Sequence, residues 1–376
     1  MNQNLTELVE VSRLYGKDKT FVIAGGGNTS FKDNDHIWVK ASGVALQTID
    51  EYGFVCLSRA KLKIVSTKTY SQESAQREAE VKADLANAIV STGSNRPSVE
   101  TSMHEIIDYQ FVVHTHPTIV NALMCSNNAE SSCRKLFGGQ SLFIPYTDPG
   151  YILFKKVETE IALFTAKSGI APQIIFLENH GVFVAANSIS EINSLYSSII
   201  EKINQKINEV LPDDLAKPFK SAIIDHIQEL HSDFATFVAM GIESNIIHHF
   251  AKDKTSFQKA ATAFTPDDIV YCKAHYLFIP AFSDPKDQIK SAVAKIEDYV
   301  NSYGYLPKVI AVEGHGVVAV EETLKSVRNV LEVFTNILKI SFLSENFGGP
   351  KFMTKAQIDF IDNWEVENYR RKMAKS

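Results

Sequence analysis

Two histidines, His114 and His116, follow the apolar run Tyr109–Val113 and precede Pro117. The aromatic and β-branched residues of that run predict a buried strand. Because residues i and i+2 of a strand point to the same face, the two imidazoles should project side by side. Neutral imidazole is a common ligand of zinc and similar ions. For an isolated pair, two ordinary polar residues at a strand end would be the better interpretation, but other parts of the chain reverse it.

A third histidine, His180, lies between two further apolar runs, 174–177 and 182–186. A polar segment between two strands is costly to bury unless its groups are paired or serve a purpose. Gly181 permits a bulge or a close backbone approach beside this histidine. Two histidines on a strand and a distant third make the pattern of a catalytic metal site, in which one coordination position stays open.

The cysteines do not offer an alternative metal site. A structural zinc site would more often use cysteines at short spacing. This chain shows no C-x-x-C pair, so its four cysteines are interpreted as small core residues in a reducing compartment; they are Cys56, Cys125, Cys133 and Cys272.

The composition is that of an ordinary globular protein, with 376 residues, 45% hydrophobic and 22% charged. A net charge of −6 argues against nucleic-acid binding, which would favour a basic face. The N-terminus shows no secretion signal, and no apolar run is long enough to span a bilayer. We expect a cytoplasmic protein without nucleic-acid or membrane partners.

Apolar periodicity predicts a mixed α/β domain over residues 1–210. We expect strands at 21–24, 37–40, 110–115, 173–178 and 181–186, and helices at 4–15, 73–91, 99–108, 118–125, 150–167 and 188–209. The segment Leu211–Asp214 breaks the pattern and is the candidate boundary. A C-terminal α/β extension over 213–376 should contain helices near 214–230, 233–249 and 321–343, with strands at 275–280 and 308–320.

Two short motifs recur at one offset, which suggests that the extension is a degenerate copy of the first domain. The segment 142–145 recurs at 277–280, and Glu178–Val182 recurs as Glu313–Val317, both at an offset of 135 residues (277 − 142 and 315 − 180). At that offset His249 and Ala251 replace the His-x-His pair, so no second metal site is expected. His315 is interpreted as a structural histidine; chance remains a competing explanation for such short matches.

Taken together, the motifs resemble those of the class II aldolase/adducin family. The resemblance covers about residues 10–205 and is carried by Gly27–Ser30, Ala41–Gly43, Pro97–Glu100, His114–Pro117 and Asn179–Gly181. It implies a three-layer αβα fold with a central mixed sheet. The extension, through Thr265–Ile269 and Phe278–Pro280, resembles the middle of bifunctional rhamnulose-phosphate aldolase/lactaldehyde dehydrogenase proteins. We expect their dehydrogenase domain to be absent here.

The resemblance implies an enzyme of carbohydrate metabolism, a metal-dependent lyase that cleaves a ketose phosphate such as rhamnulose 1-phosphate. It implies that His114, His116 and His180 hold a divalent ion, with zinc favoured. Such an ion acts as a Lewis acid on the substrate's oxygens. Glu100 is the implied acid/base, and a carboxylate near a metal can move a proton to or from carbon. Its alternative role is a first-turn carboxylate favoured by the helix dipole.

The resemblance also implies a phosphate-binding pocket and a homo-oligomer. Loop amides, hydroxyls and a helix N-terminus offer donors to phosphate oxygens, although the same small residues could merely build turns. The candidate residues are Asn28, Thr29, Ser30, Ser42, Gly43 and Ser98. Val99 replaces the second serine of simple fuculose-phosphate aldolases, which removes one hydroxyl donor.

Two further features bear on the site. Gly25–Gly27 leads into another strand-like segment and lacks the G-x-G-x-x-G spacing that opens a helix, so no NAD is expected. His104 falls four residues after Glu100 and would share its helix face. It could orient that carboxylate, although the default interpretation is a histidine packed and hydrogen-bonded locally.

Other functions stay open at this point, because one fold can host several reactions. Sugar-phosphate epimerases and dehydratases are similar in fold and metal site. A non-catalytic, adducin-like binding protein is the alternative from another class, and the presence of all three histidines with Glu100 argues against it.

Overall fold

The computed structural model describes residues 3–90, 95–212, 214–232 and 237–364. The chain divides into two compact units. The first comprises residues 1–124 and 128–206, and the second comprises residues 125–127 and 207–376. The expected boundary at 211–214 lies close to this division.

The first unit is built on a seven-stranded sheet in the order β3-β2-β1-β4-β7-β6-β5. Neighbouring strands are antiparallel except β5 and β6, which run parallel, so the sheet is mixed as predicted. Its strands are β1 (Asn28–Lys32), β2 (His36–Lys40), β3 (Phe54–Ser58), β4 (Phe111–Thr115), β5 (Leu142–Ile144), β6 (Ile174–Leu177) and β7 (Gly181–Ala186).

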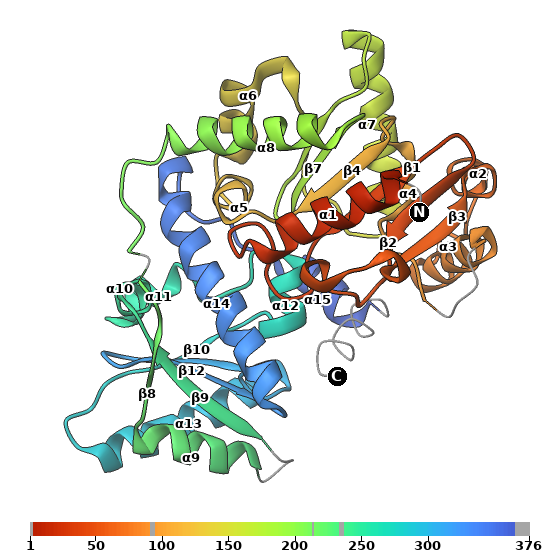
Figure 1. Ribbon diagram of the computed structural model, residues 1–376. Helices are drawn as coiled ribbons and strands as arrows, with labels where there is room; N and C mark the ends of the chain where they lie inside the picture. Colours follow the sequence, from red (N-terminus) through yellow and green to blue (C-terminus); the bar gives the residue numbers. More distant parts are fainter. Residues whose placement is uncertain (1–2, 91–94, 213, 233–236, 365–376) are drawn as a thin grey trace. The chain divides into compact units, whose positions relative to one another are not determined.

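Helices cover both faces of this sheet, which gives the predicted three layers (Figure 1). On one face lie α1 (Gln3–Lys17), α5 (Thr118–Met124) and α8 (Ile189–Asn204). On the other lie α2 (Arg59–Thr67), α3 (Ser74–Ala88), α4 (Thr101–Ile106) and α7 (Tyr151–Ser168). The unit also contains α6 (Ala129–Phe137) and the 3₁₀ turns η1 (Leu46–Thr48), η2 (Glu51–Gly53) and η3 (Gly138–Gln140).

The expected strand at 21–24 is wrong. These residues form a loop, and the strand begins only at Asn28. The carbonyls of Thr20 and Phe21 accept hydrogen bonds from the amides of Thr118 and His116, at 2.9 and 3.2 Å. The apolar side chains that suggested a strand therefore belong to a loop that is held against the end of β4.

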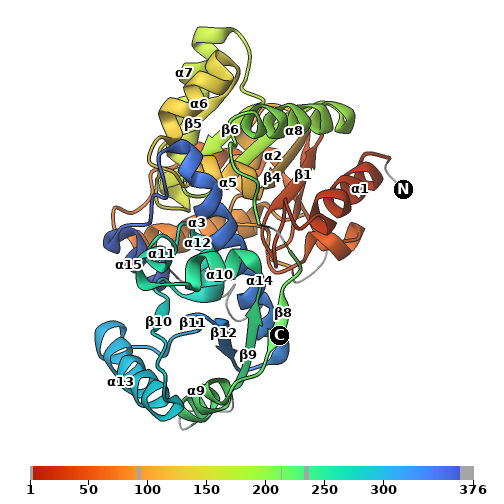
Figure 2. The same cartoon turned by 90° about the vertical axis from the view of Figure 1, so that its left-hand side faces the viewer.

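The second unit has a five-stranded sheet in the order β10-β11-β12-β9-β8. Its strands are β8 (Lys217–Phe219), β9 (Val238–Glu243), β10 (Leu277–Ile279), β11 (Val309–Val312) and β12 (Gly316–Glu321). On one face pack α9 (Ala222–Ser232) and α13 (Pro285–Tyr303), and on the other α10 (Asn245–Ala251) and α14 (Leu324–Ser344) (Figure 2). The remaining elements are α11 (Lys254–Gln258), α12 (Pro266–Cys272), η4 (Glu345–Phe347) and α15 (Lys355–Asn363).

The helix expected at 233–249 is also wrong, because its described part contains strand β9 followed by the short helix α10. Residues 233–236 lie outside the described residues. The burial pattern of β9 is intermediate at five of its six positions. A half-buried apolar run of this kind is hard to distinguish from a helix by periodicity.

The second sheet repeats five strands of the first in the same order. The series β10-β11-β12-β9-β8 matches β5-β6-β7-β4-β1, and Leu277 pairs with Ile310 as Leu142 pairs with Ile175. The turn before the last central strand is also repeated: Gly314 donates to the Ala251 carbonyl at 3.0 Å, as Asn179 donates to Met124 at 3.1 Å. Shared order, register and turn support the internal repeat.

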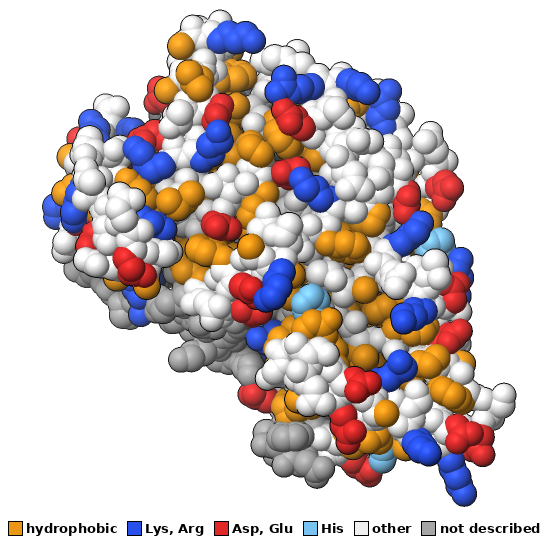
Figure 3. Space-filling view, turned by 180° about the vertical axis from the view of Figure 1, so that it is seen from behind, with side chains coloured by type: hydrophobic (Ala, Val, Ile, Leu, Met, Phe, Trp, Pro, Cys, Tyr) orange, Lys and Arg blue, Asp and Glu red, His pale blue; other side chains and the backbone are white. Residues whose placement is uncertain are grey.

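The surface carries charges of both signs. Figure 3 shows basic and acidic side chains interspersed over the face that it presents. This mixture agrees with a modest net charge of −6. Among the helices that the structure describes, none combines the length and apolarity that a membrane crossing requires.

Candidate metal and catalytic site

His114 lies on the central strand β4, where the sheet fixes its direction. Residues alternate across a strand, so His114 points to one face while Thr115 points to the other. The Thr115 hydroxyl lies 2.8 Å from the hydroxyl of Tyr196 on α8. That tyrosine also donates to the Val113 carbonyl at 3.0 Å, which fastens the strand at this point.

His116 stands one residue beyond β4, and the start of β7 leaves room for its ring. A Cβ added at Gly181 would lie 2.5 Å from His116 Cδ2 and 2.7 Å from the Thr115 carbonyl oxygen. Contacts this short do not occur without movement, so a residue without a side chain is required for the observed ring position. Gly181 therefore permits the close approach expected from the sequence.

His180 lies in the turn between β6 and β7. Asn179 adopts a left-handed backbone conformation there, with φ at 53°, which asparagine tolerates better than most residues. The amide of His180 donates to the Leu177 carbonyl at 3.3 Å. Its own carbonyl accepts from the Asn121 side chain of α5 at 3.2 Å. These bonds hold the turn beside the end of β4 that carries His114.

The structure brings the three histidines together, with one ring nitrogen of each within 4.8 Å of the others. His114 Nε2 lies 3.0 Å from His116 Nε2 and 3.4 Å from His180 Nε2. His114 Nδ1 donates to the Val182 carbonyl at 3.0 Å, which assigns the proton to Nδ1 and leaves the Nε2 lone pair facing the cluster. Burial lowers the pKa of His114 well below its usual range, so the ring is neutral, as a metal ligand must be.

Glu100 completes the cluster from the N-terminus of α4, where it is the residue that precedes the helix. Its Oε1 lies 3.5 Å from His114 Nε2 and 3.4 Å from His180 Nε2. Its Oε2 accepts a hydrogen bond from the Asn28 side-chain amide. Among the described residues, Oε1 is buried without a hydrogen-bond partner. A buried carboxylate oxygen aimed at imidazole nitrogens suits a divalent cation between them.

The protonation of Glu100 agrees with such a cation. Burial raises the pKa of this carboxyl, but the imidazoles of His114 and His180 and the Asn28 amide outweigh it and lower the pKa to about 2. The Asn28 hydrogen bond to Oε2 favours the ionised form of Glu100 whatever the charge of the imidazoles.

The residues expected to bind phosphate divide into two groups. Ser98 is buried, and its oxygen accepts from Asn28 Nδ2 at 3.3 Å and from the Glu100 amide at 3.2 Å. Ser42 and Gly43 follow β2 on a loop whose backbone pairs with the segment before Ser98: the Ser42 amide donates to the Arg96 carbonyl at 2.8 Å, and the Ser98 amide to the Lys40 carbonyl at 3.2 Å. Within this group, Ser98 is the residue that contacts Glu100.

Thr29 and Ser30 are fully buried and have other partners. The Thr29 hydroxyl lies 2.6 Å from that of Ser12 on α1, on the opposite face of β1 from Asn28. The Ser30 hydroxyl lies 2.7 Å from His104 Nδ1. Both hydroxyls are thus engaged within the protein.

The repeat in the second unit does not reproduce the histidine cluster, and the sequence offset misplaced its equivalents. Val317 pairs with Ile242 as Val182 pairs with Thr115, so the offset for this strand is 127 residues (242 − 115). The equivalents of His114 and His116 are therefore Gly241 and Glu243, rather than His249 and Ala251.

The side chains of the second unit also explain why no cluster forms at the equivalent place. His315, the equivalent of His180, is exposed, and its Nδ1 donates to the Glu313 carbonyl at 3.0 Å. A Cβ at Gly241 would lie 2.7 Å from the ring of Phe219, which fills the space beside the strand. Within the part of the chain that the structure describes, the His, Cys, Asp and Glu side chains that gather closely enough to hold a metal are His114, His116 and His180.

Sequence reasoning missed the connections between these side chains. His104 is fully buried and hydrogen-bonds Asn28 and Ser30. The sequence suggested either a locally packed and hydrogen-bonded histidine or one that orients Glu100, and neither interpretation included these two partners. The spacing of four residues between His104 and Glu100 was the available signal. The role of the Val182 carbonyl had no signal, because a main-chain acceptor leaves no mark on residue type.

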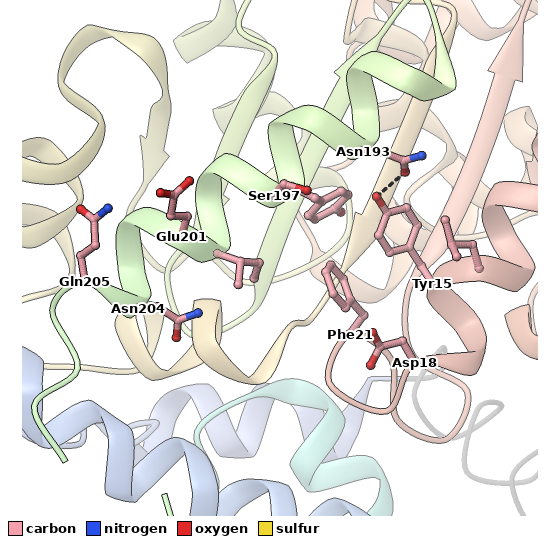
Figure 4. A pocket seen from close by; sticks show the side chains of 11 residues that line it. Tyr15, Asp18, Phe21, Asn193, Ser197, Glu201, Asn204 and Gln205 are labelled. Carbon is pink, nitrogen blue, oxygen red and sulfur yellow. Dashed lines mark hydrogen bonds between the residues drawn. The ribbon is translucent and has the colours of Figure 1, made fainter. Parts of the chain in front are cut away.

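A pocket of about 890 Å³ lies elsewhere on the first unit, between the end of α1 and α8 (Figure 4). Tyr15 and Phe21 form part of its wall, and Tyr15 donates to Asn193 at 2.7 Å. None of the predicted site residues lines it. The pocket is thus separate from the histidine cluster.

Comparison with known proteins identifies the family to which this chain belongs. The model of the class II aldolase and adducin N-terminal domain matches residues 6–201. The chain belongs to the class II aldolase and adducin family. This confirms the family that the sequence motifs indicated.

One curated relative is YuxG of Bacillus subtilis (strain 168), which is named an uncharacterized oxidoreductase. It is 25% identical over 327 residues, and the match covers 80% of this chain but 45% of YuxG. The chain thus spans less than half the length of this relative.

Solved structures give matches that cover about half of the chain. The N-terminal class II aldolase domain of a conserved protein from Thermoplasma acidophilum has 27% identity and a TM-score of 0.47, covering 55% of this chain and 94% of that one. An L-fuculose-1-phosphate aldolase from Thermus thermophilus has 14% identity and a TM-score of 0.34, covering 53% and 92%.

Proposed function

We propose that this protein is a divalent-metal-dependent lyase that cleaves a carbon–carbon bond in a ketose phosphate such as rhamnulose 1-phosphate. The observation that supports it best is the grouping of three imidazole nitrogens within 4.8 Å of one another, with Glu100 Oε1 3.4 to 3.5 Å from two of them. Membership of the class II aldolase and adducin family supports the same reaction class.

His114, His116 and His180 would hold the ion, and zinc is favoured because three nitrogen ligands with one open position suit it. When bound, such an ion supplies Lewis-acid stabilisation of negative charge on the substrate's oxygens. The Val182 carbonyl fixes the ring of His114, and the absent side chain at Gly181 admits the ring of His116. The sheet therefore holds the histidine rings in position before the ion binds.

Glu100 would act as the acid/base. Retro-aldol cleavage requires a group that can take a proton and return one to carbon. Glu100 is ionised at neutral pH, since its pKa is lowered to about 2, and its Oε1 faces the ligand nitrogens while its Oε2 is held by Asn28. One oxygen is therefore placed for proton transfer and the other is fixed.

Ser42, Gly43 and Ser98 would bind the phosphate. Both Ser98 hydrogen bonds described above use its oxygen as acceptor, so its hydroxyl proton can be donated to a phosphate oxygen. Asn28 borders this group but uses its amide on Glu100 and Ser98. Thr29 and Ser30 are left out of this proposal because their hydroxyls are engaged elsewhere. We also propose, from the family resemblance, a homo-oligomer.

The test is a panel of ketose 1-phosphates incubated with the purified zinc-loaded protein, with dihydroxyacetone phosphate measured by a coupled assay. We expect triose release from at least one member, and no release after removal of the ion with a chelator. Turnover without triose would replace the lyase with an epimerase or dehydratase. Failure to bind any divalent ion would contradict the enzyme assignment altogether.

A further inference from the structure

One face of strand β1 is joined by side-chain hydrogen bonds to the segment that carries Glu100. Residues 28, 30 and 32 alternate along the strand and so share a face. Asn28 bonds Glu100 and His104, Ser30 bonds His104, and Lys32 bonds the end of the same helix. Three polar side chains on a fully buried strand are costly unless each is satisfied, and here each has partners in α4 or beside it.

His104 is the centre of this network. Its Nε2 donates to the Asn28 carbonyl oxygen, because that oxygen can only accept. Burial lowers the pKa of His104 to about 3, so the ring is neutral and its Nδ1 must accept. The Ser30 hydroxyl, 2.7 Å away, is the donor to Nδ1. The ring thus has one tautomer and one orientation.

The orientation of Asn28 follows from His104. With its carbonyl oxygen bound to the imidazole, the Asn28 amide group must point the other way, towards Glu100 Oε2 and the Ser98 oxygen. The bond to Oε2 then directs the other oxygen, Oε1, towards His114 and His180. A flipped Asn28 would present an oxygen to the carboxylate and repel it.

Lys32 fixes the far end of the same helix. Its ammonium group donates to the carbonyls of His104 at 2.5 Å, Glu105 at 3.1 Å and Ile107, which uses all three of its protons. The carbonyls of His104 and Glu105 lie in the last turn of α4, where the end of a helix leaves carbonyls without partners in the helix. Glu105 also receives both a 2.9 and a 3.0 Å bond from Arg59. The short helix is therefore anchored independently of Glu100.

We propose that His104 is a positioning residue that fixes the Asn28 amide and, through it, the direction of the Glu100 carboxylate. The inference rests on the proposed role of Glu100 in proton transfer. His104 itself would contact neither the ion nor the substrate. It acts because a buried imidazole with a single tautomer leaves Asn28 only one way to face.

The test compares His104→Phe, which keeps an aromatic ring but removes both hydrogen bonds, with His104→Gln, which can still donate to Asn28 and accept from Ser30. We expect kcat to fall about 10- to 100-fold in His104→Phe with KM little changed, as is usual for partners behind a metal site. His104→Gln should recover most of the loss. The control is Ser12→Ala, equally buried and on the opposite side of β1, which should keep the wild-type kcat.

Crystal structures of the zinc-loaded wild type and His104→Phe give a readout that does not depend on activity. We expect Asn28 flipped or displaced and Glu100 Oε1 turned from His114 in the variant. An unchanged carboxylate would overturn the inference, as would equal kcat losses in His104→Phe and His104→Gln. If His104→Phe does not fold, Ser30→Ala serves instead and should show the same displacement. Absence of triose release by the wild type would contradict the proposed function. The orientation of Asn28 and Glu100 in the variant crystal structure would still decide whether His104 positions them.

Discussion

Gly181 faces the imidazole of His116 so closely that a side chain at this position would collide with the ring. A Cβ there would lie 2.5 Å from His116 Cδ2, well inside van der Waals contact. We therefore expect Gly181→Ala to displace this ring and to weaken zinc binding by about 10- to 100-fold, the range seen when support of a ligand is lost. Isothermal titration of the metal-free protein measures the affinity.

Gly139→Ala is the matched control, because no atom lies within 4 Å of an added Cβ at that position. It should bind zinc with wild-type affinity. Equal affinities for both variants and the wild type would show that His116 does not need its observed position to bind the ion.

The metal itself can be tested by replacing one histidine in each unit. His114→Ala should lose the divalent ion, because it removes a central ligand and leaves a cavity beside Phe183, whose ring stacks on His114 at 4.0 Å. His315→Ala should keep the ion, because that exposed residue lies at the equivalent of His180 in a unit without a cluster. Elemental analysis of the purified proteins gives the ratio of metal to chain. Equal metal content in the two variants would argue against this site.

Glu100→Gln keeps the shape of the side chain but removes its charge and its capacity to take a proton. We expect triose release to slow by about 100- to 10,000-fold, the usual contribution of general acid–base catalysis. Zinc content should stay near that of the wild type, because the three histidines remain. The control Glu130→Gln alters a surface carboxylate that pairs with Arg134 at 2.7 Å and should leave the rate unchanged. A Glu100→Gln enzyme with normal turnover would require a different proton-transfer group.

Burial of His104 predicts a specific acid sensitivity of the fold. Its folded-state pKa is about 3, while an unfolded histidine titrates near 6.5. Unfolding therefore takes up a proton below pH 6.5, and this contribution to stability falls as the pH is lowered from about 6.5 towards 3. By pH 5 the loss should reach roughly 2 kcal/mol.

Urea unfolding of the metal-free protein at pH 7 and pH 5 measures this effect. In His104→Gln, which does not titrate, the decrease in stability between the two pH values should be smaller by about the same 2 kcal/mol. An identical pH dependence in both proteins would mean that the imidazole is already protonated in the folded state.

The sequence by itself determined which residues could do the chemistry and on what kind of element they lie. His114 and His116 had to share a face because strand geometry repeats every two residues, and Gly181 marked a close approach because only glycine permits one. The ordered motifs also identified the family and its mixed sheet. These features are local or shared by relatives, so the order of residues along the chain is enough to reveal them.

The prediction of strands was less accurate where apolar residues pack against a neighbouring loop instead of pairing with another strand. Phe21 and its neighbours have the composition of a strand, yet their backbone bonds the loop after β4. In the second unit, the repeat offset of 135 residues holds from Leu277 onwards but is 127 at β9. A difference in length between the copies is invisible to a comparison at one fixed offset.

Only the tertiary structure decided which side chains meet. His114 and His180 are 66 residues apart and come together through the pairing of β4 with β7. The chain of hydrogen bonds from Ser30 through His104 and Asn28 to Glu100 spans more than 70 residues and depends on helix α4 packing across one face of β1. Such contacts follow from sheet register and packing, which long-range burial selects and which the sequence around each residue does not record.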